Sequence, residues 1–163
     1  MTVRGILVGS AVLFGAVGAV RKYKAFCEER MAASRAILGF IKYRGELMSR
    51  FSSSKSEICK KYEDEILEKS GFLPTLREGK SFIDALRSSR KNLPLSDAAI
   101  EILETIFAEM GNGYLDEERQ RQKAAELEMA AFAAKEKEEL ERDVKVKTTL
   151  ILAAALGAII LIL

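Results

Sequence analysis

The stretch TTLILAAALGAIILIL, from Thr148 to Leu163, contains sixteen residues and no charged side chain. A second uncharged stretch of the same length, GILVGSAVLFGAVGAV, runs from Gly5 to Val20. As a helix, each stretch extends about 24 Å, against about 30 Å for a hydrocarbon core, so flanking residues must complete the crossing. We therefore predict a transmembrane helix at each end of the chain, over residues 1–20 and 148–163.

Basic residues border both apolar stretches on the side of residues 21–147. They are Arg21, Lys22 and Lys24 after the first stretch, and Arg142, Lys145 and Lys147 before the second. The positive-inside rule then predicts a two-pass protein of the cell membrane, with residues 21–147 in the cytoplasm and both termini outside. Two alternatives remain: a cleaved signal peptide at the N-terminus, and a buried helix of a soluble core at the C-terminus.

Small residues recur in both apolar stretches at positions where two helices can approach closely. They are Gly5, Gly9, Ala11, Gly15 and Ala19 in the first stretch and Ala153 and Gly157 in the second. We expect these residues to pack the two membrane helices together. The alternative is that glycine and alanine are simply common in membrane helices.

The cytoplasmic part, residues 21–147, carries helix signals throughout. No proline occurs between Arg21 and Arg50, and apolar residues recur there with helical spacing, so the first membrane helix is expected to continue to about residue 50. No glycine or proline occurs between Tyr114 and Leu156, which predicts a second long helix, capped by Asp116. In an antiparallel pair of these helices, residues near 28 lie level with residues near 140.

Shorter helices are predicted between the two long ones. Ser54 and Glu57 have the spacing of a capping box, which predicts a helix that Gly71 closes. A short segment at Phe72–Arg77 follows, and Ser81 with Asp84 then predicts a helix to about residue 91. After a turn at residues 92–95, Ser96 caps a helix that Gly111-Asn-Gly113 ends; its apolar stripe is Ala99, Ile100, Leu103, Ile106, Phe107 and Met110.

The predicted fold class is therefore all-α, with two transmembrane helices flanking a cytoplasmic helical bundle. Composition excludes several kinds of chemistry. The chain has no histidine, which removes imidazole bases and histidine zinc ligands, and two cysteines are too few for a structural metal cage. A net charge of +2 argues against nucleic-acid binding. We find no catalytic constellation, cofactor motif or metal motif, and we expect no enzymatic activity and two reduced, partly buried cysteines.

Several phrases of the sequence resemble stage III sporulation protein AB of endospore-forming bacteria. They are AILGFIKYRGELMSRF at Ala36–Phe51, Glu57-Ile-Cys59, Ser70-Gly71, and Glu109-Met-Gly-Asn-Gly-Tyr114 before a polar helix and a terminal apolar run. In addition, LREGKSFIDAL at Leu76–Leu86, followed by Leu93-Pro94, resembles the helix-turn-helix phrase in the F domain, the cytoplasmic domain of inner-membrane platform proteins of type II secretion and type IV pilus machines.

The resemblance implies a non-enzymatic platform component of the channel between mother cell and forespore, located in the mother-cell membrane and required for spore development. It implies that the partners are the operon's secretion-type ATPase, stage III sporulation protein AA-like, and other channel proteins. We place the ATPase contact on the short helices, at Lys60, Lys61, Arg87, Arg90 and Lys91. The alternative function is a membrane-anchored structural protein that forms homo-oligomers without an ATPase.

Overall fold

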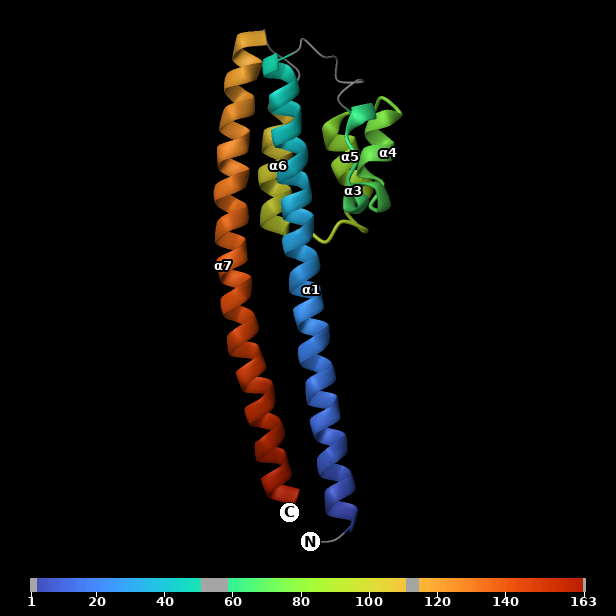
Figure 1. Ribbon diagram of the computed structural model, residues 1–163, viewed down its shortest axis with the longest axis vertical. Coiled ribbons are helices and arrows are strands. Elements are labelled where there is room, and N and C mark those ends of the chain that lie inside the picture. The colour runs from blue at the N-terminus through green and yellow to red at the C-terminus, as the bar shows by residue number, and fades with distance from the viewer. Residues whose placement is uncertain (1–2, 51–58, 111–114, 163) are drawn as a thin grey trace. The chain divides into compact units, whose positions relative to one another are not determined.

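The computed structural model describes residues 3–50, 59–110 and 115–162. These residues form helices joined by loops and contain no strand, which confirms the all-α class. The helices are α1 (Val3–Arg50), α3 (Glu65–Lys69), α4 (Phe72–Arg77), α5 (Phe82–Ser89), α6 (Asp97–Glu109) and α7 (Leu115–Ile162) (Figure 1). Both predicted long helices are thus confirmed, each with 48 residues.

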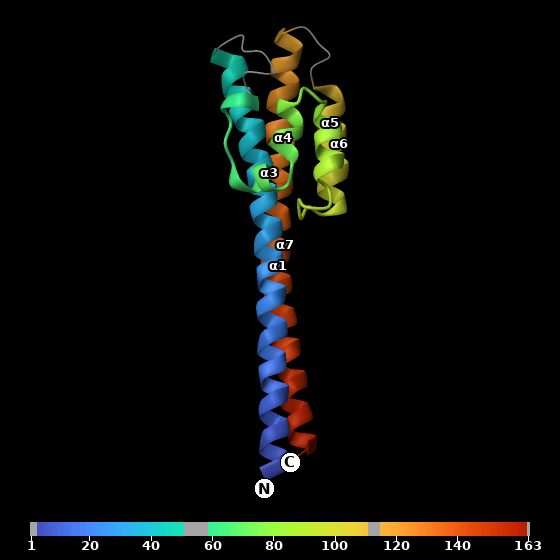
Figure 2. The same ribbon diagram turned by 90° about the vertical axis from the view of Figure 1, so that its right-hand side faces the viewer.

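The chain divides into two compact units. The first, which we call the helix-pair unit, consists of residues 1–29 and 136–163 and contains both predicted membrane segments. The second, which we call the bundle, consists of residues 30–135 and contains all of α3, α4, α5 and α6 (Figure 2).

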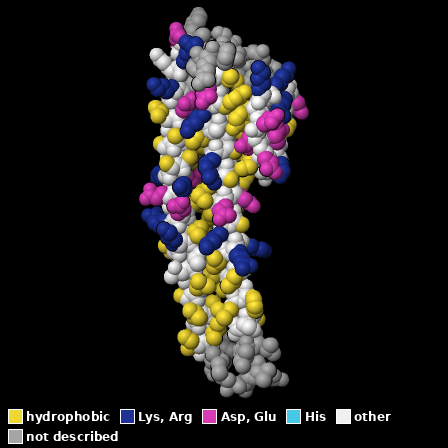
Figure 3. Space-filling view, viewed as in Figure 1, with side chains coloured by type: hydrophobic (Ala, Val, Ile, Leu, Met, Phe, Trp, Pro, Cys, Tyr) yellow, Lys and Arg dark blue, Asp and Glu magenta, His cyan; other side chains and the backbone are white. Residues whose placement is uncertain are grey.

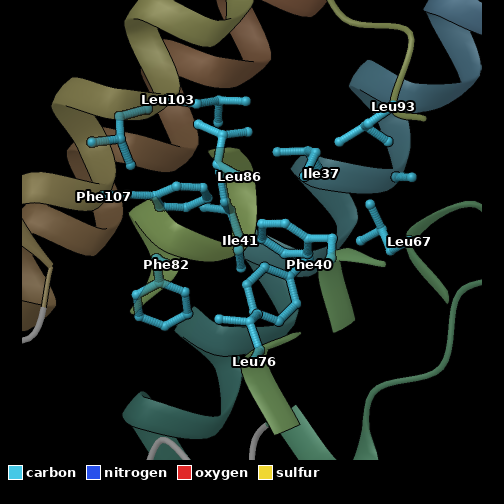
Figure 4. Packing of buried hydrophobic residues seen from close by; sticks show 14 of the residues in the cluster. Ile37, Phe40, Ile41, Leu67, Leu76, Phe82, Leu86, Leu93, Leu103 and Phe107 are labelled. Atoms are coloured by element: carbon cyan, nitrogen blue, oxygen red, sulfur yellow. The ribbon is translucent and has the colours of Figure 1, made fainter. Parts of the chain in front are cut away.

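The bundle has an aromatic centre built around Phe40 of α1 (Figure 4). The Phe40 ring is fully buried and makes edge contacts with Tyr62 and Phe72, at centroid distances of 5.4 and 5.5 Å. Phe82 of α5 stacks on Phe107 of α6 at 5.4 Å. Aromatic pairs in these geometries contribute about 0.5–1.5 kcal/mol each beyond their burial. The centre therefore ties α1, α4, α5 and α6 into one core.

Local signals placed several helix ends correctly. The Ser81 hydroxyl accepts a hydrogen bond from the Asp84 amide at 3.0 Å, and the Ser96 hydroxyl accepts one from Ala99 at 3.2 Å, so both predicted N-caps are confirmed. All six residues of the predicted apolar stripe after Ser96 are buried. Helix α5 ends at Ser89, two residues before the predicted end at Lys91.

The prediction of one helix from Ser54 to Gly71 was wrong. Residues 59–61 are helical, residues 62–64 are not, and α3 begins at Glu65. The Asp64 carboxylate accepts hydrogen bonds from the Ile66 and Leu67 amides, both at 3.0 Å, and so starts a new helix. Arg77 donates to the carbonyls of Cys59 and Tyr62, which satisfies acceptors that the break exposes.

Two further predicted helix ends are those at Gly71 and Asp116. Gly71 has φ +87°, the left-handed conformation expected of a glycine that ends a helix, and it directly precedes α4. Asp116 lies inside the first turn of α7, which begins at Leu115, so it is not the N-cap that we predicted. Its negative charge is still favourable there, because the start of a helix carries partial positive charge. The proposed capping box at residues 54–57 and the stop at residues 111–113 lie outside the described residues.

Within each unit, α1 and α7 run antiparallel in the predicted register. In the helix-pair unit, Gly9 lies beside Ile159, and the Lys147 ammonium donates to the Tyr23 hydroxyl at 2.9 Å. In the bundle, Arg44 of α1 hydrogen-bonds Gln122 of α7. The residue numbers of each pair sum to nearly the same value as 28 and 140, so the register that we predicted for the antiparallel pair is confirmed.

Candidate interaction surfaces

The helix-pair unit exposes large apolar side chains on both of its helices. Phe14 is 79% exposed and Leu161 is 89% exposed. The other exposed ones in the two apolar stretches are Val8, Leu13, Val17, Leu150, Leu152, Leu156 and Ile160. A soluble protein rarely exposes so continuous an apolar surface, because water solvates it poorly. Among the described residues, one helix, α7, contains a segment apolar and long enough to span a membrane.

The face through which the two helices pack differs from the one that we predicted. Gly9 and Ala155 are buried, as are Cys27 and Leu140 further along the pair. Within residues 8–29 of α1, the less exposed residues recur mostly every three or four positions, at Gly9, Val12, Ala16, Val20, Tyr23 and Cys27, with Ser10 beside Gly9. This spacing forms one stripe along a helix, and its rotational position decides which small residues lie between α1 and α7.

Of the predicted small residues whose surroundings are described, one lies between the two helices and five are exposed. Gly9 lies between the helices, where an added Cβ would touch Ile159 at 3.7 Å. The others whose surroundings are described are exposed: Ala11, Gly15, Ala19, Ala153 and Gly157. An added Cβ would meet no atom within 4 Å at Gly15 or Gly157. The surroundings of Gly5 lie outside the described part. These five exposed residues thus do not pack α1 against α7.

The five candidate docking residues are all exposed, and they fall into groups by their neighbours. Arg87 and Arg90 form ion pairs with α6, at 3.4 Å to Glu104 and 3.0 Å to Asp97. Because all four side chains are exposed, each pair contributes little to stability and can exchange for a pair with another protein.

Lys60 belongs to a cleft of mixed charge, lined with Glu63, Asp64, Glu65, Glu68 and Arg77. The acidic side chains of this cleft have local partners: the Lys69 ammonium donates to Glu65 and lowers the pKa of that carboxyl group, and Arg77 pairs with Glu68. Because four carboxylates and only one other basic side chain line the cleft with Lys60, the positive charge of Lys60 is offset by its neighbours. Lys61 and Lys91 are exposed lysines that do not line this cleft, so they are better candidates than Lys60 for a contact with an acidic partner.

The bundle also contains a buried polar network that sequence reasoning missed. The Arg44 guanidinium donates one hydrogen bond to the Glu118 carboxylate and another to the Gln122 amide oxygen. The side chains of Arg44 and Glu118 are each 7% exposed. The Gln122 amide nitrogen donates to the Ile41 carbonyl at 2.5 Å, and the guanidinium lies 5.4 Å from the centroid of the Phe82 ring.

This network fixes α1 against α7 within the bundle. Every donor and acceptor named belongs to a structural contact within the bundle. A shift of one helix by a single turn would separate the Arg44 charge from Glu118, and burying an unpaired charge is costly. The network therefore specifies the register of the two helices.

Both cysteines and several ionisable side chains of the described residues are buried or make local contacts. The part of the chain that the structure describes holds no group of three or more acidic or cysteine side chains arranged for a metal ion. Cys27 and Cys59 are free thiols with exposures of 1% and 0%. The pKa of Asp84 is lowered because the Ser81 hydroxyl donates to its carboxylate, and burial raises the pKa of Tyr62.

Comparison with models of known protein families, with curated proteins and with solved structures finds no match to this chain.

Proposed function

We propose that this chain is a non-enzymatic membrane platform component of the sporulation channel between mother cell and forespore. In this proposal α1 and α7 anchor it as a two-pass protein in the mother-cell membrane, with residues 21–147 in the cytoplasm. The bundle docks a secretion-type ATPase, stage III sporulation protein AA-like, and the protein is required for spore development. The family resemblance in the sequence supplies the identity of the channel and of the ATPase.

The exposed apolar surface of the helix-pair unit is the observation that carries the membrane part of the proposal. Side chains such as Phe14 and Leu161 are stable in lipid and unfavourable in water. Helix α7 alone contains a segment that is long enough and apolar enough to cross a membrane. The N-terminal part of α1 exposes apolar side chains of the same kind, which supports a second crossing.

The docking part of the proposal is supported by the exposed basic side chains of the bundle. Arg87 and Arg90 hold only exposed ion pairs, and Lys61 and Lys91 extend into solvent. Complementary charge speeds association and sets orientation when the partner presents carboxylates. In this mechanism the bundle receives a displacement from the ATPase, and the continuous helices α1 and α7 pass it toward the membrane.

The test is direct binding of the full chain, in detergent or nanodiscs, to the operon's ATPase with and without ATP. We expect saturable binding at micromolar concentration or below. The variant Lys61→Glu/Lys91→Glu should weaken binding by about tenfold or more, which corresponds to about 1.4 kcal/mol. The matched control, Lys42→Glu/Lys123→Glu, reverses two other exposed lysines of the bundle and should bind like the parent.

Two results would count against the proposal. Unchanged binding of the Lys61 and Lys91 variant at physiological salt would remove this patch from the interface. No binding at all by a full chain that is demonstrably helical would remove the ATPase as a partner.

The second candidate is a structural membrane protein that forms homo-oligomers. Five of the small residues that we singled out lie exposed on the helix-pair unit, which leaves them available to another copy of the chain. Crosslinking in native membranes that yields only homo-oligomers, together with absent ATPase binding, would favour this candidate. Gly15→Leu should then reduce the crosslinked dimer, because a large side chain prevents close helix approach.

A further inference from the structure

Six basic side chains of the helix-pair unit border its apolar part. We call them the basic collar: Arg21, Lys22, Lys24, Arg142, Lys145 and Lys147. All six are exposed. The antiparallel register brings Tyr23 beside Lys147: the ammonium donates to the Tyr23 hydroxyl at 2.9 Å and lies 4.4 Å from its ring centroid. Residues 21–24 therefore lie level with Lys145 and Lys147, and Arg142 lies further from the apolar part, level with Glu28.

The collar separates an apolar surface from an acidic one. On one side, exposed large apolar residues continue from Val17 of α1 and Leu150 of α7 away from the collar, and two more, Phe26 and Val146, lie among the charged residues. On the other side, exposed glutamates follow on both helices: Glu28, Glu29, Glu138, Glu139 and Glu141. Residues 21–24 and 142–147 together contain one acidic residue, Asp143. Figure 3 shows basic side chains at the border of the apolar part of the helix pair and acidic side chains beyond them.

This order of apolar, basic and acidic layers matches one leaflet of a bilayer. Hydrocarbon meets the apolar surface, the headgroup phosphates meet the cations, and the glutamates stand in water. The acidic residues begin close to the collar: Glu28 lies four residues after Lys24, about 6 Å along α1, and Glu141 is adjacent to Arg142 on α7. These separations are shorter than the Debye length of about 8 Å at physiological salt, so the glutamates weaken the attraction of the collar for phosphate, most at Arg142 and least at Arg21 and Lys22.

We propose that the basic collar binds the phosphate headgroups of anionic phospholipids and so gives the membrane anchor a preference for an anionic leaflet. This inference rests on the proposed membrane location and adds a lipid class to it. The cations of both helices contribute, because each helix supplies three of the six. Tyr23 contributes an aromatic ring with a polar tip at the same level, the kind of side chain that favours the headgroup region.

The preference can be measured on the full chain reconstituted in phosphatidylcholine vesicles. Electron paramagnetic resonance compares the association of spin-labelled phosphatidylglycerol with that of spin-labelled phosphatidylcholine. We expect the parent to prefer phosphatidylglycerol, and the preference to fall with added salt. Lys22→Gln/Lys145→Gln, which removes one collar cation from each helix, should lower the preference by up to about fivefold per cation.

The matched control is Lys42→Gln/Lys123→Gln, which removes one exposed lysine from each of the same two helices within the bundle. The control should keep the full preference of the parent. Circular dichroism should give the same helix content for the parent and both variants, since all four lysines are exposed.

The outcomes separate this inference from the proposed function. A parent that resists alkaline extraction from the vesicles but shows equal association with both lipids overturns the lipid preference and leaves the membrane platform intact. A collar variant with the full preference also overturns the assignment to these cations. A parent that alkaline carbonate extracts as a soluble protein overturns both the preference and the proposed membrane anchor.

Discussion

Removing one member of the buried Arg44–Glu118 pair should destabilise the bundle far more than removing both. The pair is almost fully excluded from solvent, with 7% exposure for each side chain. In Glu118→Leu, the guanidinium stays buried with the neutral Gln122 oxygen and the Phe82 ring as its remaining named contacts. An uncompensated buried charge costs about 3–5 kcal/mol, and Arg44→Met, which leaves the carboxylate, should cost a similar amount.

The double variant Arg44→Met/Glu118→Leu should be within about 1 kcal/mol of the parent, because two apolar side chains of similar volume replace two desolvated charges. The coupling free energy between the two positions then has a magnitude of about 5 kcal/mol or more. The assay is urea unfolding of residues 21–147, followed by circular dichroism; this fragment contains the whole apolar core. A conservative control is Glu118→Gln, which keeps an acceptor for the guanidinium and should fall between the single variants and the parent.

Two results would refute this reasoning. Single variants that cost less than about 1 kcal/mol would mean that water reaches the pair, as it does for exposed ion pairs. Additive costs in the double variant would mean that each side chain is held by its other contacts and that the pair does not set the register.

Three further outcomes follow from local geometry. Ser81→Ala should cost about 1 kcal/mol through the lost N-cap, measured by urea unfolding. In the parent, Asp84 has a lowered pKa, so it stabilises the fold above the ordinary Asp pKa of about 3.9, and this contribution disappears as pH falls through its folded pKa; the Ser81 variant should lose that pH dependence. Gly71→Ala should cost about 1–2 kcal/mol, because its φ of +87° is strained for alanine, and a cost near zero would contradict the left-handed assignment. Cys27 and Cys59 should react with Ellman's reagent only after denaturation, since exposures of 1% and 0% block access; immediate labelling of either thiol would contradict its burial.

Features that depend on neighbouring residues were predictable. Ser81 and Ser96 each lie three residues before the amide that they cap, so the signal is contained in a few positions. The break before α3 had a local signal as well, because Asp64 is a strong N-cap residue. The register of α1 and α7 was predictable because the two helices contain apolar stretches of equal length at the two ends of the chain and run antiparallel.

Features that depend on rotation about a helix axis, or on distant residues, were not predictable in the same way. Composition identified small residues in the membrane segments, but it could not tell that Gly9 lies between the helices while Gly15 is exposed. The Arg44–Glu118 pair joins positions 74 residues apart, and no local pattern marks it. The antiparallel register places Arg44 nearly level with Glu118, and an acidic residue at that level would have predicted the pair. The membrane topology and the partners stay predictions.

The large separation along the sequence between Arg44 and Glu118 also has a consequence for synthesis on the ribosome. At 5–20 residues per second, roughly 4 to 15 seconds pass between the addition of Arg44 and that of Glu118, 74 residues later. During that interval helices α3 to α6 can assemble on the apolar face of α1, but the Arg44 guanidinium cannot yet pair with the Glu118 carboxylate. We therefore expect nascent chains that end before residue 118 to be held by chaperones, and ribosome-bound chains of increasing length should show release only once α7 emerges.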